Sequence, residues 1–166
     1  MVSFTALALM ASTAIAGPVA HQAGIPKGWN WQVEGWSAGC ARSGCYYNFN
    51  VTIPSVKNGP AGVKAYCSGS EQGYDSSFSV PSTFRNCQLL EGVNNGVSAR
   101  FNLREQVRPG QGGGMGPKEI EVSFAYAIPE KNTAYNFTGS HETIYNQFVA
   151  PLQNFTITPT KVAAVA

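Results

Sequence analysis

Alternation of apolar and polar residues is the feature that most limits how this 166-residue chain can fold. Runs in which apolar and polar residues alternate occupy residues 47–53, 63–67, 97–103 and 120–128, and shorter ones begin at Trp29 and Phe155. Successive side chains of a strand point to opposite faces of a sheet, so each run can bury one face and wet the other. The pattern predicts antiparallel strands, with a last strand that starts at Phe155 and runs on towards Val162.

Turn signals separate these runs, and the composition agrees with them. The triplets at residues 58–60 and 94–96 contain Asn-Gly, which tolerates the positive φ of tight turns. Only 12% of the residues are charged, while 18 are glycine, which argues against a helical bundle. The expected fold is therefore all-β, a compact antiparallel β-barrel or β-sandwich. Residues 140–149 form the only stretch that fits a short helix, and a loop fits it equally well.

The N-terminus reads as a targeting segment. Residues 4–16 carry no charge and end in Ala14-Ile15-Ala16, the small-x-small pattern of a signal-peptide cleavage site. The segment is too short for the roughly 20 apolar residues of a membrane-spanning helix. We therefore expect a secretory signal peptide over 1–16, a flexible leader over 17–28 and a single domain over 29–166, secreted in soluble form.

Four cysteines agree with secretion. Cys40, Cys45, Cys67 and Cys87 are an even number in an oxidising compartment, which predicts two intrachain disulfides. Pairing Cys40 with Cys45 and Cys67 with Cys87 is favoured, and the nested pairing of Cys40 with Cys87 and Cys45 with Cys67 is its rival. No Cys-x-x-Cys pair is present, so no metal or other cofactor is expected.

Three Asn-x-Ser/Thr acceptor patterns also fit a secreted protein. They place candidate N-glycosylation sites at Asn50, Asn136 and Asn154. The alternation puts Asn50 on the outward side of its strand, as a glycan requires.

Charge gives little sign of a polyanionic partner. The net charge is +2 and the basic residues are scattered. The nearest approach to a basic stripe is Arg100, Arg104 and Arg108, which we interpret as the solvated face of a strand. The glycine-rich stretch 109–117 lacks the Gly-Lys-Ser/Thr ending of a phosphate loop and is expected to be a flexible hairpin loop. Neither nucleic acid nor membrane is an expected partner.

Catalytic groups are scarce. His21 lies in the leader, so His141 is the only candidate base, and we expect it to be an exposed loop residue. Glu119 and Glu121 share a strand face, with Glu105 on a neighbouring strand, as a glycosidase pair would need. The same carboxylates serve as outward solubilising charges. The chain is therefore predicted not to be an enzyme, with a small secreted hydrolase as an alternative.

Several aromatic residues could instead stack on sugar rings. Trp29, Trp31, Trp36, Tyr46 and Tyr66 are the candidates, and they motivate a second alternative, an extracellular polysaccharide-binding module. Burial of Trp29 and Trp31 in the core is the favoured interpretation, because aromatic side chains contribute large buried areas.

Three stretches carry a resemblance to a known group of proteins. They are residues 31–40 followed by residues 45–51, residues 65–69 with the later Cys87, and residues 155–160. Together they resemble small secreted fungal proteins similar to the Alternaria major allergen and to hypersensitive-response elicitors. The resemblance implies a compact β-fold with two disulfides and a non-enzymatic elicitor or effector that binds a host protein or a cell-wall polysaccharide. It carries over no catalytic residue. The allergen has a further cysteine that links two chains; this chain lacks it, so a monomer or a non-covalent oligomer is expected.

Overall fold

The computed structural model describes residues 24–41, 44–72, 82–93, 95–107, 116–147 and 151–165. The expected signal peptide over 1–16, most of the leader and most of the glycine-rich stretch lie outside these ranges. Within the ranges, the chain forms strands and one short 3-10 helix, η1 (Pro129–Lys131).

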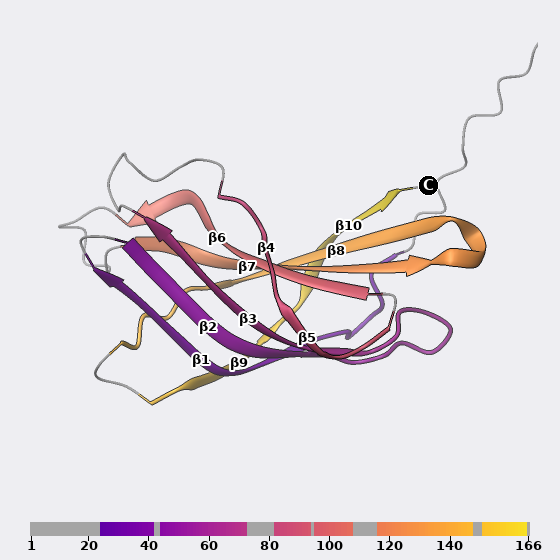
Figure 1. Ribbon diagram of the computed structural model, residues 1–166, viewed down its shortest axis with the longest axis horizontal. Coiled ribbons are helices and arrows are strands. Elements are labelled where there is room, and N and C mark those ends of the chain that lie inside the picture. Colours follow the sequence, from indigo (N-terminus) through magenta and orange to yellow (C-terminus); the bar gives the residue numbers. More distant parts are fainter. Residues whose placement is uncertain are drawn as a thin grey trace, which may run out of the picture.

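The strands belong to two five-stranded sheets in which every pairing is antiparallel (Figure 1). Sheet A has the order β5-β3-β2-β1-β9 and contains β1 (Trp31–Ala41), β2 (Gly44–Ile53), β3 (Val63–Gln72), β5 (Gln88–Glu91) and β9 (Gln153–Ile157). Sheet B has the order β10-β8-β7-β6-β4 and contains β4 (Arg85–Asn86), β6 (Asn95–Val107), β7 (Gly116–Ile128), β8 (Thr133–Glu142) and β10 (Pro159–Val165).

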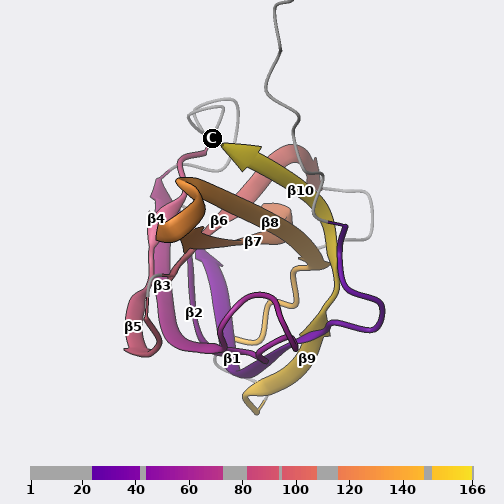
Figure 2. The same cartoon turned by 90° about the vertical axis from the view of Figure 1, so that its right-hand side faces the viewer.

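The two sheets face each other as two layers (Figure 2). The all-β antiparallel fold class is confirmed, and it takes the sandwich form of the two that the sequence allowed. Among the described strands, the pairings do not close the sheets into a barrel. The chain changes sheets on both sides of β4, again between β5 and β6, and on both sides of β9.

The core lies between the sheets and consists of the inward residues of the alternating runs. Trp29, Trp31 and Trp36 are all buried there, as favoured for the first two. Trp31 and Phe124 meet edge to face with ring centroids 6.3 Å apart, which joins the sheets through an aromatic contact. The Tyr47 hydroxyl of sheet A donates a hydrogen bond to the Ala99 carbonyl of sheet B at 2.8 Å.

A β-bulge at Gly35 changes the alternation within β1. The register shifts between Glu34 and Ser37 on the β2 side, and Gly35 has φ +65°. One extra residue in a strand turns the following side chains to the other face. Trp36 and Ala38 therefore point into the core, in a different phase from Trp31 and Val33.

Both favoured disulfides are present. Cys40 and Cys45 are directly opposite each other at the β1–β2 turn. Cys67 of β3 is bonded to Cys87, which lies between β4 and β5 where the chain returns to sheet A. The described cysteines include no free thiol.

The helix prediction over 140–149 is wrong for the described residues. Residues 140–142 end β8, and residues 143–147 form an irregular segment. His141 is therefore a half-buried strand residue, which corrects the expected exposed position in a loop. Asn146 holds the irregular shape, because its side chain bonds to backbone groups of β1 instead of leaving them to water.

The last predicted strand is divided in two. β9 ends at Ile157 in sheet A, and β10 begins at Pro159 in sheet B. Proline has no N–H to donate to a strand ladder, so it commonly begins a strand rather than continuing one. The predicted strand from Phe155 to Val162 therefore contributes its first residues to sheet A and its last residues to sheet B.

Candidate functional site

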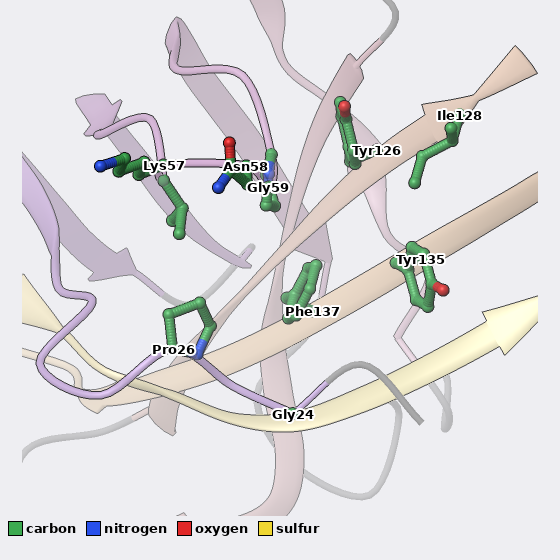
Figure 3. Close-up of a pocket in the computed structure, with 11 residues that line it drawn as sticks. Gly24, Pro26, Lys57, Asn58, Gly59, Tyr126, Ile128, Tyr135 and Phe137 are labelled. Atoms are coloured by element: carbon green, nitrogen blue, oxygen red, sulfur yellow. The ribbon is translucent and has the colours of Figure 1, made fainter. Parts of the chain in front are cut away.

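A pocket of about 320 Å³ lies at one end of the sandwich (Figure 3). Three segments enclose it: the residues before Trp29, the loop between β2 and β3, and the β7–β8 hairpin. We call it the end pocket; it is lined by Gly24, Pro26, Val56, Lys57, Asn58, Gly59, Pro60, Tyr126, Ile128, Tyr135 and Phe137.

Aromatic residues of the β7–β8 hairpin form one wall of the end pocket. Tyr126 and Tyr135 are directly opposite each other across the hairpin, and Phe137 is two residues further along β8. Phe137 is 2% exposed and meets Trp29 edge to face, with ring centroids 5.0 Å apart. The aromatic wall is thus continuous with the core, which holds it in place.

The β2–β3 loop forms the facing wall. The amide of Val56 donates to the carbonyl of Pro60, and the amide of Gly59 donates to the carbonyl of Val56, both at 3.0 Å. Asn58 takes the left-handed conformation, φ 59°, that the Asn-Gly turn signal allows. Lys57 is the only lining residue with a charged side chain, and Figure 3 shows its amine directed away from the space between Gly59 and Phe137.

The segment from Gly24 to Pro26 covers the third side. The Trp29 amide donates to the Pro26 carbonyl at 3.2 Å, and the Trp29 indole N–H donates to the Pro54 carbonyl at 2.8 Å. Ile25 packs against the core. Trp29 therefore ties this segment to the loop on the other side of the pocket, so part of the expected leader belongs to the site.

The lining suits binding of a small uncharged molecule. Ligand pockets in proteins are mostly apolar, have volumes of roughly 300–1,000 Å³ and carry a few polar groups that orient the ligand. Here Tyr126, Tyr135 and Asn58 are the uncharged polar residues of the lining. Among the residues that the structure describes, the lining contains no histidine and no carboxylate.

The predicted catalytic candidates lie elsewhere and have other contacts. The His141 ring stacks on Phe155 with centroids 4.0 Å apart, and its Nδ1 is 2.7 Å from the Glu142 carbonyl oxygen. Glu119 accepts a hydrogen bond from the Asn102 amide at 3.1 Å. Glu105 belongs to β6, as expected, but its side chain is outside the description. The structure therefore brings none of the described candidates to the pocket.

Glu121 corrects the expectation of an outward solubilising charge. It is 6% exposed, and its carboxylate is 2.7 Å from Arg100 Nη2 and 3.7 Å from Lys161 Nζ. The Arg100 guanidinium also lies 4.2 Å above the centre of the Phe84 ring and donates to the Ser82 carbonyl at 3.0 Å. Arg100 and Glu121 face each other in the β6–β7 register. Arg100 and Glu121 both occupy polar positions of alternating runs, and this was the sequence feature from which their pairing could have been predicted.

Clusters of metal ligands and membrane-spanning helices are both absent from the part of the chain that the structure describes. No three His, Cys, Asp or Glu side chains there come together as metal ligands. No helix in the same residues is long and apolar enough to cross a bilayer.

The candidate sugar-stacking residues divide into two groups. The three tryptophans are buried, whereas Tyr46 and Tyr66 are each 38% exposed and alternate with buried residues, which places them on the outer face of sheet A. The three glycosylation candidates, Asn50, Asn136 and Asn154, are all exposed.

Comparison of the chain with family models, with curated proteins and with solved structures finds no match in any of the three.

Proposed function

We propose that this protein is a secreted, non-enzymatic binding protein of the fungal elicitor or effector type, which recognises a host or cell-wall component. The end pocket is the observation that carries the proposal. Its walls are aromatic, aliphatic and nearly neutral, and the candidate acid–base residues lie elsewhere. Such a lining supports a role in holding a ligand.

The two disulfides support the extracellular part of the proposal. Disulfides form and persist in oxidising compartments and are rare in reducing ones. Together with the apolar N-terminal segment, they favour passage through the secretory pathway.

Leaf infiltration with matched variants tests both the elicitor role and the pocket. A Cβ added at Gly24, on the pocket lining, would meet no heavy atom within 4 Å, so Gly24→Trp is the variant designed to obstruct the pocket. Gly96 in β6 has equally open surroundings but does not line the pocket, and Gly96→Trp is the control. The wild-type protein and the control are expected to cause ion leakage, and Gly24→Trp is expected to cause much less. No response from any protein across several hosts contradicts the elicitor role, and equal responses contradict the role of the pocket.

A polysaccharide-binding module is the second candidate, and the exposure of Tyr46 and Tyr66 on the outer face of sheet A favours it. Aromatic rings on an open face can stack on sugar rings. Pull-down on chitin, cellulose and glucan tests it. Retention that is lost in the Tyr46→Ala and Tyr66→Ala variants supports this candidate, and no retention of the wild-type protein rejects it.

A further inference from the structure

Asn50 and Tyr66 are direct partners in the β2–β3 ladder. Both are exposed, and both alternate with buried residues, so their side chains share the outer face of sheet A. Directly opposite residues on one face of an antiparallel pair have Cβ atoms about 4.5–5.5 Å apart. The acceptor asparagine of one glycosylation pattern therefore lies beside an exposed aromatic ring.

On the other side, Asn50 is paired with Glu34 of β1, which is also exposed. The next residue of β1 is the bulge residue Gly35, and a Cβ built on it would lie 3.9 Å from the Asn50 Nδ2. Among the described residues, none forms a hydrogen bond with the side-chain amide of Asn50. The Nδ2 atom, to which a glycan would be joined, is therefore accessible and uncommitted.

The other two acceptor asparagines have different neighbours. Asn136 lies between Ala125 and Ala163 in the sheet B ladders, and its Oδ1 accepts a hydrogen bond from the Ser123 hydroxyl at 2.5 Å. Asn154 lies on the edge strand β9, and its Oδ1 accepts from the Gly35 amide at 2.9 Å. Asn50 is the one acceptor of the three that is paired with an exposed ring.

We propose that Asn50 carries an N-glycan whose first sugar packs against the face of the Tyr66 ring. In the transfer, Nδ2 bonds to the anomeric carbon of an oligosaccharide carried on a polyprenyl pyrophosphate. The bond from that carbon to the pyrophosphate oxygen breaks, the pyrophosphate leaves with the electron pair, and Nδ2 loses one proton. The proposal goes beyond the leading binding function and shares with it only the passage through the secretory pathway. It competes with the polysaccharide-binding candidate, because that candidate uses the same Tyr66 ring.

The packing follows from the chemistry of the two rings. A pyranose has a face of C–H groups, and the face of an aromatic ring is apolar and electron-rich. Contact between them removes both faces from water, while the sugar hydroxyls and the phenol hydroxyl stay solvated. Tyr46, equally exposed on the same face, is paired with Ser70, and the acceptor asparagine lies four residues along its own strand. It therefore serves as a matched control without a neighbouring glycan.

Occupancy is tested first, on the full chain secreted from a yeast host. Intact masses before and after endoglycosidase treatment are compared for the wild-type protein, Asn50→Gln and Thr52→Ala. Both variants are expected to lose the mass of one glycan relative to the wild-type protein. Unchanged glycan mass in the variants overturns the proposal.

Packing on Tyr66 is tested by coupling in thermal unfolding. Asn50→Gln is combined with Tyr66→Ala and, separately, with Tyr46→Ala. Loss of the glycan is expected to lower Tm by about 2–4 °C when Tyr66 is present and by much less when it is alanine. The Tyr46→Ala background should show the full loss. Equal losses in all backgrounds overturn the packing on Tyr66. Neither readout depends on a leaf response, so failure of the elicitor role would leave this test intact.

Discussion

At the scale of single residues, the outer face of sheet B is held by a charged cluster rather than by a layer of water. Arg100 is bound to Glu121 and reaches across to Ser82 and Phe84, and the Ser82 hydroxyl donates to the Phe101 carbonyl. The segment before β4 is thereby fixed over β6. A buried carboxylate without its cation would leave an uncompensated charge, so both members of the pair are needed.

Glu121→Ala is therefore expected to lower the free energy of unfolding by about 2–3 kcal/mol, below the full cost of a completely buried pair because Arg100 is partly solvated. The exposed Lys64–Glu91 pair, at 2.8 Å, provides the control, and Glu91→Ala is expected to leave stability unchanged because solvent screens that pair. Urea unfolding of both variants measures the difference. Equal midpoints would show that the buried cluster contributes no more than a surface ion pair.

A second residue-scale prediction concerns alkaline pH. Burial raises the pKa of the Tyr47 hydroxyl well above the ordinary value of 10.0, an effect partly offset by the positive charge of Arg85. Burial likewise raises the pKa of Tyr145. The unfolded chain releases these protons near pH 10 while the folded chain keeps them, so the folded state binds more protons and stability falls as pH rises above about 10.

Tyr47→Phe removes one of the two tyrosine hydroxyls whose pKa is raised by burial. At pH 8 it should cost about 1 kcal/mol, the usual contribution of a hydrogen bond such as that to the Ala99 carbonyl. Between pH 9 and pH 11, the urea midpoint of this variant should fall less steeply than that of the wild-type protein. Parallel slopes would contradict the contribution of Tyr47.

At the scale of elements, the bulge and the irregular segment after β8 depend on each other. β1 is paired with β9 only as far as Trp36. Beyond that point Asn146 takes the place of a neighbouring strand. Its Oδ1 accepts from the Ala38 amide, and its Nδ2 donates to the Trp36 carbonyl, both at 2.9 Å. The Ala38 carbonyl in turn accepts from the Asn146 amide at 3.1 Å.

Asn146→Ala would leave buried backbone groups of β1 without partners. Each unsatisfied buried group costs roughly 1–3 kcal/mol, so the variant is expected to lose about 2–3 kcal/mol in total. Amide hydrogen exchange at Ala38 should accelerate more than exchange at Val51, which lies in the middle of the same sheet. Gln32→Ala, an exposed substitution on β1, is the control and should change neither quantity. Unchanged protection of Ala38 would contradict the strand-like role of Asn146.

The sequence was informative at this scale where alternation was regular, and less so where it changed phase. The inward set of β2 is buried as predicted. In β7, Ile120, Val122 and Phe124 are buried as predicted, whereas Tyr126 and Ile128 are half-buried at the end pocket. Nothing in the sequence showed that Gly35 forms a bulge, since glycine also occurs in turns and loops. The end pocket was equally hidden, because Gly24, Val56 and Tyr135 come together only through tertiary packing. The turn at Asn58 was predictable from local chemistry alone.

At the scale of the whole molecule, the two disulfides hold different parts of the sandwich. Cys40–Cys45 closes a hairpin that is already paired by β1 and β2, at the opposite end of these strands from the end pocket. Cys67–Cys87 joins β3 to the segment that has left sheet A, entered sheet B through β4 and returns as β5. The second bond therefore fixes the place where the chain crosses between the layers. The backbone hydrogen bonds within each sheet do not fix this crossing.

Removing each bond should show this difference. The sequence separations are 20 residues for Cys67–Cys87 and 5 for Cys40–Cys45. Closing a longer loop removes more entropy from the unfolded chain, which gives about 3 kcal/mol for the first bond and about 2 kcal/mol for the second. Cys67→Ala with Cys87→Ala should therefore destabilise the protein more than Cys40→Ala with Cys45→Ala in guanidinium unfolding of the secreted chain. Because the longer loop spans the crossing, only the first double variant should also accelerate amide exchange in β4 and β5. If the two double variants unfold at the same midpoint with the same exchange pattern, the crossing is held by packing and not by its disulfide.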